Sequence, residues 1–297
     1  MTIDYRHLKA RCFPEVRSVC TPRDAILYAL AIGVCEDPLE PQALAHVYEG
    51  APGGLRVMPT QAAVLGYPGF WAREADAGID WVRLVHGEQR LAIHQPLPVE
   101  GFLVGRNRIS HIIDKGEGKG AVVAVERTLE DETGLRYATL SQVVFCRSDG
   151  GFSRLNGGQP SDEPLTPLQP VPAREPDHRH GQRTRPDAAL LYRLLGDPNP
   201  LHADPVVAHA AGFERPILHG LATYGIACWA VLRACAAGDA RRLLSFDARF
   251  AAPVYPGEAL CTDVWEENAE IRFQTRVTDT GRERVVMSHG RAILAGG

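Results

Sequence analysis

The sequence lacks the features typical of membrane proteins, nucleic-acid-binding proteins and nucleotide-binding proteins. Their absence reduces the number of functions to consider. It holds no run approaching the ~20 apolar residues that a membrane-spanning helix needs, and its opening residues, MTIDYRHLKARCFPEV, have no apolar signal core. A net charge of only −4 argues against a protein that holds nucleic acid by charge. No glycine-rich loop of nucleotide-binding spacing follows a strand-like run, so neither a dinucleotide site nor a P-loop is supported.

Cysteine and histidine patterns with a recognised purpose are also missing. The seven cysteines are scattered, odd in number and without CxxC spacing, so we expect free thiols that behave as small buried hydrophobic groups in a reducing compartment. His178 and His180 lack further partners at a known ligand spacing; we interpret them as solvated linker residues and expect no metal site. The final Ala-Gly-Gly is not a peroxisomal address. We therefore expect a cytoplasmic protein without membrane or nucleic-acid partners.

What the chain does contain is typical of a folded protein with room for two domains. Of its 297 residues, 45% are hydrophobic and 23% are charged, as in ordinary globular proteins. Residues 149–182 are rich in glycine, proline and charge, with little periodicity, and this predicts a linker. We therefore divide the chain into a domain at 1–148, the linker at 149–182 and a second domain at 183–297.

Two similar helix patterns indicate an internal repeat. In each, a threonine N-cap, an aspartate three residues later, a proline in the first turn and a closing glycine frame a helix. The two patterns run over 21–33 and 184–196. A strand followed by a proline-rich turn then recurs at 90–101 and 246–257. The sequence therefore predicts one fold that has been duplicated.

Strand-like runs follow each proline-rich turn. In several of them apolar or β-branched residues alternate with charged ones, which is typical of antiparallel strands with one solvent-facing side. These runs cover 102–113, 121–129, 135–146, 260–266, 271–278 and 284–294. Residues 217–236 predict a long helix that is apolar nearly all round and therefore buried.

A short segment of the second half, GDPNPLH, holds the most useful chemistry. It places the carboxylate of Asp197 near the imidazole of His202, in a stretch whose two prolines oppose a continuing helix. Presented from such a bent loop, the two groups could bracket one water molecule and act as general acid and base. The alternative is that Asp197 caps the next helix and His202 fills a polar core position. Spacing alone leaves both interpretations open.

The stretch 192–221 resembles the signature of the MaoC-like dehydratases, specifically the (R)-specific 2-enoyl-CoA hydratases of the hydratase 2 group. The matching residues are Tyr192, Arg193, Gly196, Asp197, Asn199, Pro200, Leu201, His202, Asp204, Gly212, Phe213, Pro216, Ile217, Leu218, His219 and Gly220. The likeness continues through YALAIG at 28–33, HGEQ at 86–89 and DKGEGKG at 114–120. It spans nearly the whole chain, which is similar to the hydratase unit of the peroxisomal multifunctional enzyme.

This resemblance implies a double hot-dog fold of the α+β class, with two tandem repeats in each of which a curved antiparallel sheet wraps a central helix. It implies a hydro-lyase of fatty acid β-oxidation that adds water to one face of trans-2-enoyl-CoA and yields (R)-3-hydroxyacyl-CoA. No cofactor is expected, because coenzyme A is part of the substrate. A homodimer of double hot-dog subunits is implied as well.

The resemblance also assigns catalytic roles. Asp197 and His202 share the proton transfers, in an order that the sequence leaves open, and Asn199 orients substrate or water. Gly220, near the start of the predicted buried helix, would offer its backbone N–H to the thioester oxygen, whereas His219 is expected to be structural. The equivalent stretch of the first repeat, VCEDPL, has no histidine at the matching offset. We therefore expect catalysis in the second repeat and acyl binding in the first.

For coenzyme A the resemblance points to His86, Gly87, Lys115 and Phe250. Lys115 lies in a glycine-rich loop where an ammonium could meet phosphate, although the residues alone favour a solvated turn. Phe250 precedes a proline-rich turn and either lines the pocket or belongs to the core.

Two alternatives remain open. The same fold could serve a branched or dicarboxylic enoyl-CoA such as mesaconyl-CoA, for which Arg193 or Arg249 would supply the extra positive charge. The chain could also be a non-catalytic acyl-CoA-binding hot-dog protein. A thioesterase is disfavoured, because Asp-x-Asn-Pro-Leu-His is the hydratase pattern.

Overall fold

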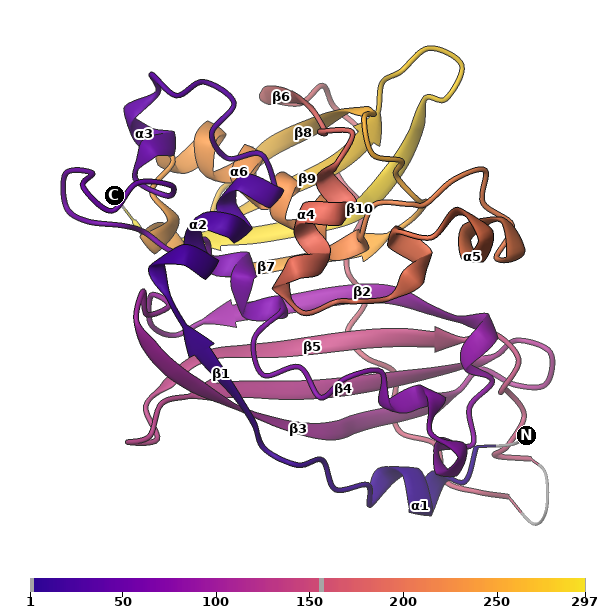
Figure 1. Ribbon diagram of the computed structural model, residues 1–297. Coiled ribbons are helices and arrows are strands. Elements are labelled where there is room, and N and C mark those ends of the chain that lie inside the picture. Colours follow the sequence, from indigo (N-terminus) through magenta and orange to yellow (C-terminus); the bar gives the residue numbers. More distant parts are fainter. Residues whose placement is uncertain (1–2, 155–157, 297) are drawn as a thin grey trace.

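The computed structural model describes residues 3–154 and 158–296, and these residues form ten strands and a set of mostly short helices (Figure 1). The strands of the first repeat are β1 Val16–Cys20, β2 Leu84–Ile93, β3 Gly101–Asp114, β4 Ala121–Glu130 and β5 Arg136–Cys146. Those of the second repeat are β6 His178–Arg183, β7 Leu243–Phe250, β8 Ala259–Glu267, β9 Glu270–Val277 and β10 Arg284–Leu294. The predicted strand runs are all confirmed to within a few residues at their ends.

One helix is long and the others are short. The α-helices are α1 Tyr5–Lys9, α2 Pro22–Ala31, α3 Pro41–Leu44, α4 Ala188–Tyr192, α5 Pro205–Ala210 and α6 Gly220–Ala236. Single 3₁₀ turns are η1 Pro59–Ala63, η2 Trp71–Arg73, η3 Ala75–Ala77, η4 Trp81–Arg83, η5 Arg193–Leu195, η6 Pro200–His202 and η7 Ala240–Arg242. No helix in the described part of the chain is both long and apolar enough to cross a bilayer.

The two repeats share a single antiparallel sheet. Its strand order is β1-β3-β4-β5-β2-β7-β10-β9-β8-β6, so β2 of the first repeat and β7 of the second pair in the middle. Along this seam Glu88 lies opposite Arg249, and Leu91 lies opposite Phe246. These are the two strands whose repeated strand-and-turn pattern predicted the duplication. The arrangement confirms the predicted double hot-dog fold.

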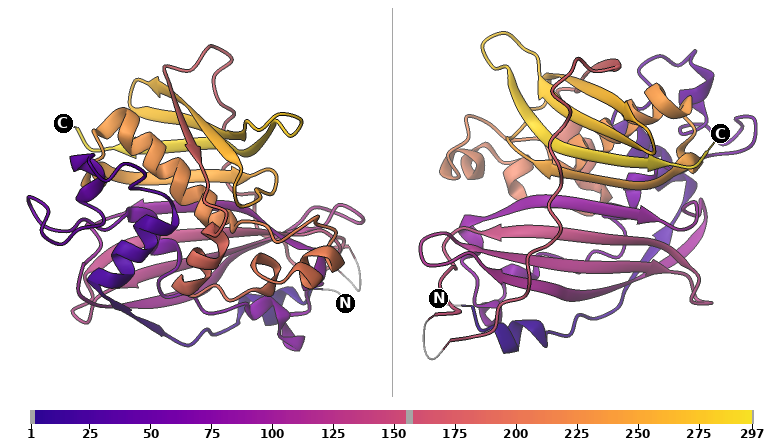
Figure 2. Two further views of the ribbon diagram at one scale, coloured as in Figure 1. Left: turned by 45° about the horizontal axis from the view of Figure 1, so that its top comes forward. Right: turned by 180° about the vertical axis from the view of Figure 1, so that it is seen from behind.

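The helix α6 is the centre of the second repeat. It packs against strands β6 to β10 and also meets η1 of the first repeat (Figure 2). Nearly every residue from Ala222 to Leu232 is buried, which confirms the prediction of a helix that is apolar on all sides. The stretch of the first repeat between α2 and β2 holds only α3 and four 3₁₀ turns. The repeats therefore share a sheet pattern but differ in the element that fills it.

The helix-cap prediction is right for the first repeat and wrong for the second. The side chain of Thr21 caps α2 by accepting from the backbone N–H of Asp24. Thr184 instead donates its hydroxyl to the Glu258 carbonyl at 2.9 Å, and α4 begins only after Asp187. The reason is that β6 continues as far as Arg183, so Thr184 still lies beside the turn that precedes β8.

The end of the predicted linker is ordered into a strand. His178 and His180 belong to β6, which pairs with β8, so assigning them to the linker was wrong, although the His178 side chain is exposed as expected. The preceding residues cross the outer side of the sheet from one repeat to the other (Figure 2, right). Backbone carbonyls of this crossing accept hydrogen bonds from the sheet, including Thr166 from Arg90 and Arg174 from the Trp265 indole.

Candidate active site

The GDPNPLH segment forms the bent loop that its prolines predict. Gly196 has a φ of 112°, a left-handed conformation that ends η5. The Asp197 carboxylate then accepts from the backbone N–H of Asn199 at 3.2 Å, and the Asn199 side-chain oxygen accepts from that of Leu201 at 3.1 Å. Asn199, and not Asp197, therefore caps η6, and its amide NH₂ group remains available to a ligand.

The His202 imidazole is held in one orientation and one tautomer. Its side chain is largely buried, with 7% of the residue exposed, and Nδ1 lies 2.8 Å from the Ile217 carbonyl oxygen. A carbonyl oxygen can only accept, so Nδ1 carries the proton and Nε2 holds the lone pair of the neutral ring. Burial lowers the pKa of His202, although the Ile217 carbonyl and the Asp197 carboxylate oppose this effect. The neutral ring is thus the form that can act as a base.

Asp197 and His202 lie close enough to share a water molecule. One carboxylate oxygen of Asp197 and one nitrogen each of His202 and His219 lie within 4.8 Å of one another. A water that makes hydrogen bonds of about 2.8 Å can bridge groups at such a separation. The Asp197 side chain is 40% exposed, so solvent can reach this point.

His219 packs tightly beneath the pair. Its ring stacks on His202 with centroids 3.7 Å apart and lies 4.9 Å from the Tyr192 ring. Burial, reinforced by His202, lowers the pKa of His219 to about 3. A permanently neutral ring at this position fits the structural role expected for it.

Gly220 begins α6 next to this cluster. In the described chain, the first backbone N–H donors of α6 with a carbonyl acceptor are those of Ala222 and Thr223, which bond to His219. The N–H of Gly220 is therefore free for a ligand, at the positive end of the helix dipole. A Cβ at this position would lie 3.2 Å from the Phe250 ring, so glycine lets that ring pack close to the start of α6.

The predicted coenzyme A residues separate into two groups. His86 packs on Phe250 with ring centroids 4.6 Å apart, and Phe250 in turn packs against Gly220, so the β2–β7 seam brings these residues together. Burial lowers the pKa of His86 to about 4. Gly87 lies beside His86 at an irregularity in the β2–β5 pairing.

Lys115 contacts neither His86 nor Phe250 and forms the second group. It is exposed in the turn between β3 and β4, where its backbone N–H bonds to the Gly120 carbonyl. The turn is organised by Asp114, whose carboxylate accepts from the backbone N–H groups of Gly116 and Gly151. The role of Lys115 toward phosphate stays a prediction.

Of the two arginines suggested for an acidic substrate, one is already paired. Arg249 lies 2.7 Å from the Glu88 carboxylate across the seam, so its charge is compensated. Arg193 is near enough to His219 to lower the pKa of that histidine.

Sequence inspection missed a third arginine, Arg127, on the inner face of β4. It is buried, and its guanidinium lies 5.6 Å from the ring centroid of Tyr67. Burial and the nearby Asp197 carboxylate raise the pKa of Tyr67 to about 12. The signal was present in the sequence, because Arg127 occupies an inward position of a strand whose other inward residues are apolar.

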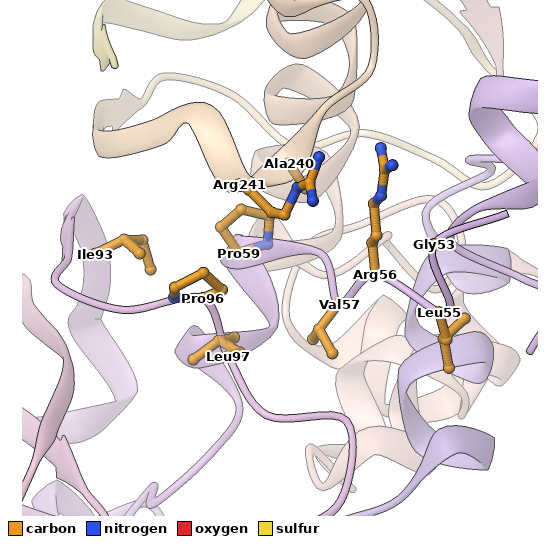
Figure 3. A pocket seen from close by; sticks show the side chains of 10 residues that line it. All are labelled: Gly53, Leu55, Arg56, Val57, Pro59, Ile93, Pro96, Leu97, Ala240 and Arg241. Carbon is orange, nitrogen blue, oxygen red and sulfur yellow. The ribbon is translucent and has the colours of Figure 1, made fainter. Parts of the chain in front are cut away.

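A cavity of about 120 Å³ has a different lining, which includes no residue of the 196–202 loop (Figure 3). Its walls include Leu55, Arg56, Leu97 and Arg241, near the C-terminal end of α6. With 17 residues and a rise of 1.5 Å per residue, α6 is about 25 Å long; Gly220 begins it, whereas Ala240 and Arg241 of the cavity wall follow its other end. Both arginines face Asp239, at 3.7 and 2.7 Å, so the cavity is not part of the Asp197–His202 site.

The expectation that no metal is bound stays a prediction. Besides the group of Asp197, His202 and His219, a second group, His178, Cys235 and Glu266, brings ligand atoms within 4.8 Å of one another at the edge of the second repeat. The His178 ring already bonds to the Glu266 carboxylate at 2.9 Å, and the two side chains are exposed.

Comparison with known proteins covers both repeats. The family model described as "MaoC like domain" matches residues 167–287, and the model described as "MFE-2 hydratase 2 N-terminal domain" matches residues 19–148. The chain is 40% identical to "3-hydroxyacyl-thioester dehydratase Y" of Mycobacterium tuberculosis, over 91% of each protein. It is 36% identical to "Enoyl-CoA hydratase 2, peroxisomal" of Arabidopsis thaliana, over 93% of this chain and 91% of that protein. The crystal structure of a MaoC-like dehydratase from Phytophthora capsici matches with a TM-score of 0.84 and 28% identity, over 99% of this chain and 98% of that one.

Proposed function

The chain belongs to the MaoC-like dehydratase family, in its hydratase 2 group, and we propose that Asp197 and His202 are the acid–base pair with which it hydrates trans-2-enoyl-CoA to (R)-3-hydroxyacyl-CoA. Enzymes of this kind are hydro-lyases, and the reaction is reversible. The observation that carries the assignment is the neutral His202 ring, one nitrogen of which lies within 4.8 Å of an Asp197 carboxylate oxygen, close enough for one water to bridge the two groups.

The geometry supports addition of both parts of water from one side of the substrate. As the water oxygen bonds to C3, the pair removes a proton from the water and returns a proton to C2, so that one H₂O is added overall. Positioned acid–base groups of this kind contribute roughly 10²–10⁴-fold each. The amide of Asn199, free on its NH₂ side, can hold the water or the substrate in place.

Negative charge that develops on the thioester oxygen needs a donor. The free N–H of Gly220, at the start of α6, supplies one, and the helix dipole adds to its effect. His86 and Phe250 pack together at the seam, and the sheet that the two repeats share supports a role for the first repeat in binding the acyl group.

The assignment is tested by following enoyl-thioester absorbance with crotonyl-CoA, a long-chain trans-2-enoyl-CoA and mesaconyl-CoA. The variants Asp197→Asn and His202→Gln should each lower kcat at least about 10²-fold. His209→Gln is the matched control, because His209 is an exposed histidine on the neighbouring helix α5. Activity that survives both catalytic changes would refute the pair. Tight binding of every thioester without turnover would favour the acyl-CoA-binding alternative.

Two further properties remain proposals. A homodimer of double hot-dog subunits is expected from the family resemblance, and light scattering coupled to size-exclusion chromatography tests it. The cytoplasmic location also stays a prediction, because relatives with peroxisomal names match the chain as well as bacterial ones do.

A further inference from the structure

Three side chains with metal-binding atoms meet at the edge of the second repeat. His178 begins β6, Glu266 lies near the end of β8, and Cys235 lies in the last turn of α6. One nitrogen, one carboxylate oxygen and the sulfur of these side chains all lie within 4.8 Å of one another. The expectation of no metal at His178 rested on the lack of partners nearby in the sequence, and the fold supplies such partners from α6 and β8.

Strand pairing positions two of the three side chains. β6 is the edge strand of the sheet, next to β8 (Figure 1), and His178 pairs with Val264. Side chains alternate between the two faces of a strand, so Glu266, two residues after Val264, lies on the same face as His178. Nε2 of His178 is 2.9 Å from a carboxylate oxygen of Glu266. α6 packs against both strands and places Cys235 beside the pair.

The separations suit one small ion. Around a tetrahedral zinc ion, with bonds of about 2.0–2.3 Å, the ligand atoms lie roughly 3.3–3.8 Å from one another. The observed spread is at most 4.8 Å, so small rotations of the side chains bring the atoms to these distances. The side chains of His178 and Glu266 are 41% and 59% exposed, which leaves both free to turn.

The charges around Cys235 favour a cation. Burial raises the pKa of the Cys235 thiol to about 11. The carboxylates of Glu266 and Asp177 act in the same direction, and Arg242 acts in the opposite one. Asp177 pairs with Arg174 at 2.7 Å, whereas no lysine or arginine of the described chain lies within ion-pair distance of the Glu266 carboxylate. The C-terminal end of α6 adds partial negative charge, so a divalent ion is favoured at this point.

We propose that His178, Cys235 and Glu266 bind one zinc ion, with a water molecule in the fourth position. Imidazole nitrogen, thiolate sulfur and carboxylate oxygen are donors that zinc takes in proteins, whereas calcium and magnesium take oxygen. The neutral His178 ring binds as it is, and the Cys235 thiol exchanges its S–H bond for a zinc–sulfur bond and releases one proton to solvent. The ion ties the edge strand β6 to β8 and α6. The proposal does not depend on the hydratase function.

The competing explanation is a surface hydrogen bond between His178 and Glu266 beside a partly buried free thiol. In that case the cysteine takes no part in any zinc binding that the protein shows. Ligation by the Cys235 sulfur is therefore the readout that separates the two explanations.

The first experiment measures zinc binding by calorimetry. The protein, without a histidine tag and kept reduced by a phosphine, is treated with a chelator, dialysed and titrated with zinc chloride at neutral pH. The wild type should bind zinc with a Kd of about 1 µM or tighter. Cys235→Ser and His178→Gln should each weaken this binding at least about 100-fold, because changing a residue that merely hydrogen-bonds to a ligand already costs about 10–100-fold. Cys12→Ser and His209→Gln are the matched controls, since both residues are exposed and lie outside the group.

Cobalt spectroscopy then shows whether the sulfur is a ligand. Cobalt(II) that replaces zinc gives a charge-transfer band in the near ultraviolet when a thiolate binds it. The wild type and His202→Gln should show this band, and Cys235→Ser should lose it. His202→Gln separates the site from the group of Asp197, His202 and His219, which contains no sulfur. Because the thiol releases one proton, the zinc affinity should rise about tenfold per pH unit between pH 7 and pH 9.

A cobalt band that depends on Cys235 supports the site. If Cys235→Ser fails to fold, a loss of zinc affinity in both His178→Gln and Glu266→Gln, together with the band in the wild type, supports it instead. A wild type that binds no zinc with the expected affinity or shows no thiolate band overturns the proposal, as does a band that remains in folded Cys235→Ser. A zinc affinity that is independent of pH also overturns it.

Discussion

The buried His219 should make the stability of the protein depend on pH. In the unfolded chain a histidine titrates near pH 6.5, whereas in the folded protein burial lowers the pKa of His219 to about 3. Below pH 6.5 this histidine therefore binds a proton in the unfolded chain but stays neutral in the folded protein. The contribution of His219 to stability is fully present above pH 6.5 and is lost as the pH falls toward 3.

The size of the effect follows from the two pKa values. Between pH 7 and pH 5 the unfolded histidine becomes almost fully protonated while the folded one stays neutral, which removes about 2 kcal/mol of unfolding free energy. His86, with a pKa lowered to about 4 by burial, adds a loss of the same sign. The wild-type protein should therefore be markedly less stable at pH 5 than at pH 7.

The variant His219→Asn isolates the contribution of one ring, because it removes the titrating group. Urea unfolding followed by circular dichroism at pH 7 and pH 5 gives the loss of stability for each protein. The loss should be smaller in His219→Asn by about 2 kcal/mol. The exposed His209 provides the control, and His209→Asn should show the wild-type loss. An equal loss in wild type and His219→Asn would refute the reasoning, whatever the absolute stability of the variant.

Three other outcomes are expected. Because burial lowers the pKa of His202, kcat/KM for crotonyl-CoA should stay level as the pH is lowered to 6.5 and should fall with a midpoint below pH 6.5. A midpoint at or above pH 6.5 would contradict the assignment of a buried neutral base. Gly220→Ala places a Cβ 3.2 Å from the Phe250 ring and should lower kcat about 10-fold or more by displacing the oxyanion donor, with little change in melting temperature. Gly105→Ala sets a Cβ 2.4 Å from the Gly66 backbone and should cost about 2 kcal/mol of unfolding free energy or more, measured by urea unfolding; wild-type stability would show that this strand contact can yield.

Much of the fold was predictable because its local signals agree with its tertiary structure. The buried and less buried residues of β4 alternate from Val125 onward as the sequence does, and the glycines at 33 and 196 take the left-handed conformations that end helices. The edge strands β1 and β6 were missed. Both are short, and charged or polar residues such as those of HRHGQR protect an exposed edge at the expense of a recognisable strand pattern.

The sequence predicted the positions of the 196–202 loop residues better than it predicted the contacts made by residues of the sheet. Asp197, Asn199 and His202 lie within five positions of one another in one bent loop, so a local motif was enough to place them together. The proximity of His86 to Phe250 and of Arg127 to Tyr67 depends on how strands pair across the sheet. Contacts of that kind come from tertiary structure and have no local signature.

The seam between β2 and β7 limits how substrate can reach the site. Backbone hydrogen bonds join the two repeats in the middle of the sheet, with Glu88 opposite Arg249 and Leu91 opposite Phe246. The two strands can separate only if several of these hydrogen bonds break together. The two repeats therefore do not move apart as hinged domains to admit a ligand. The seam therefore stays closed, and a thioester reaches Asp197 from the solvent side, where that side chain is 40% exposed.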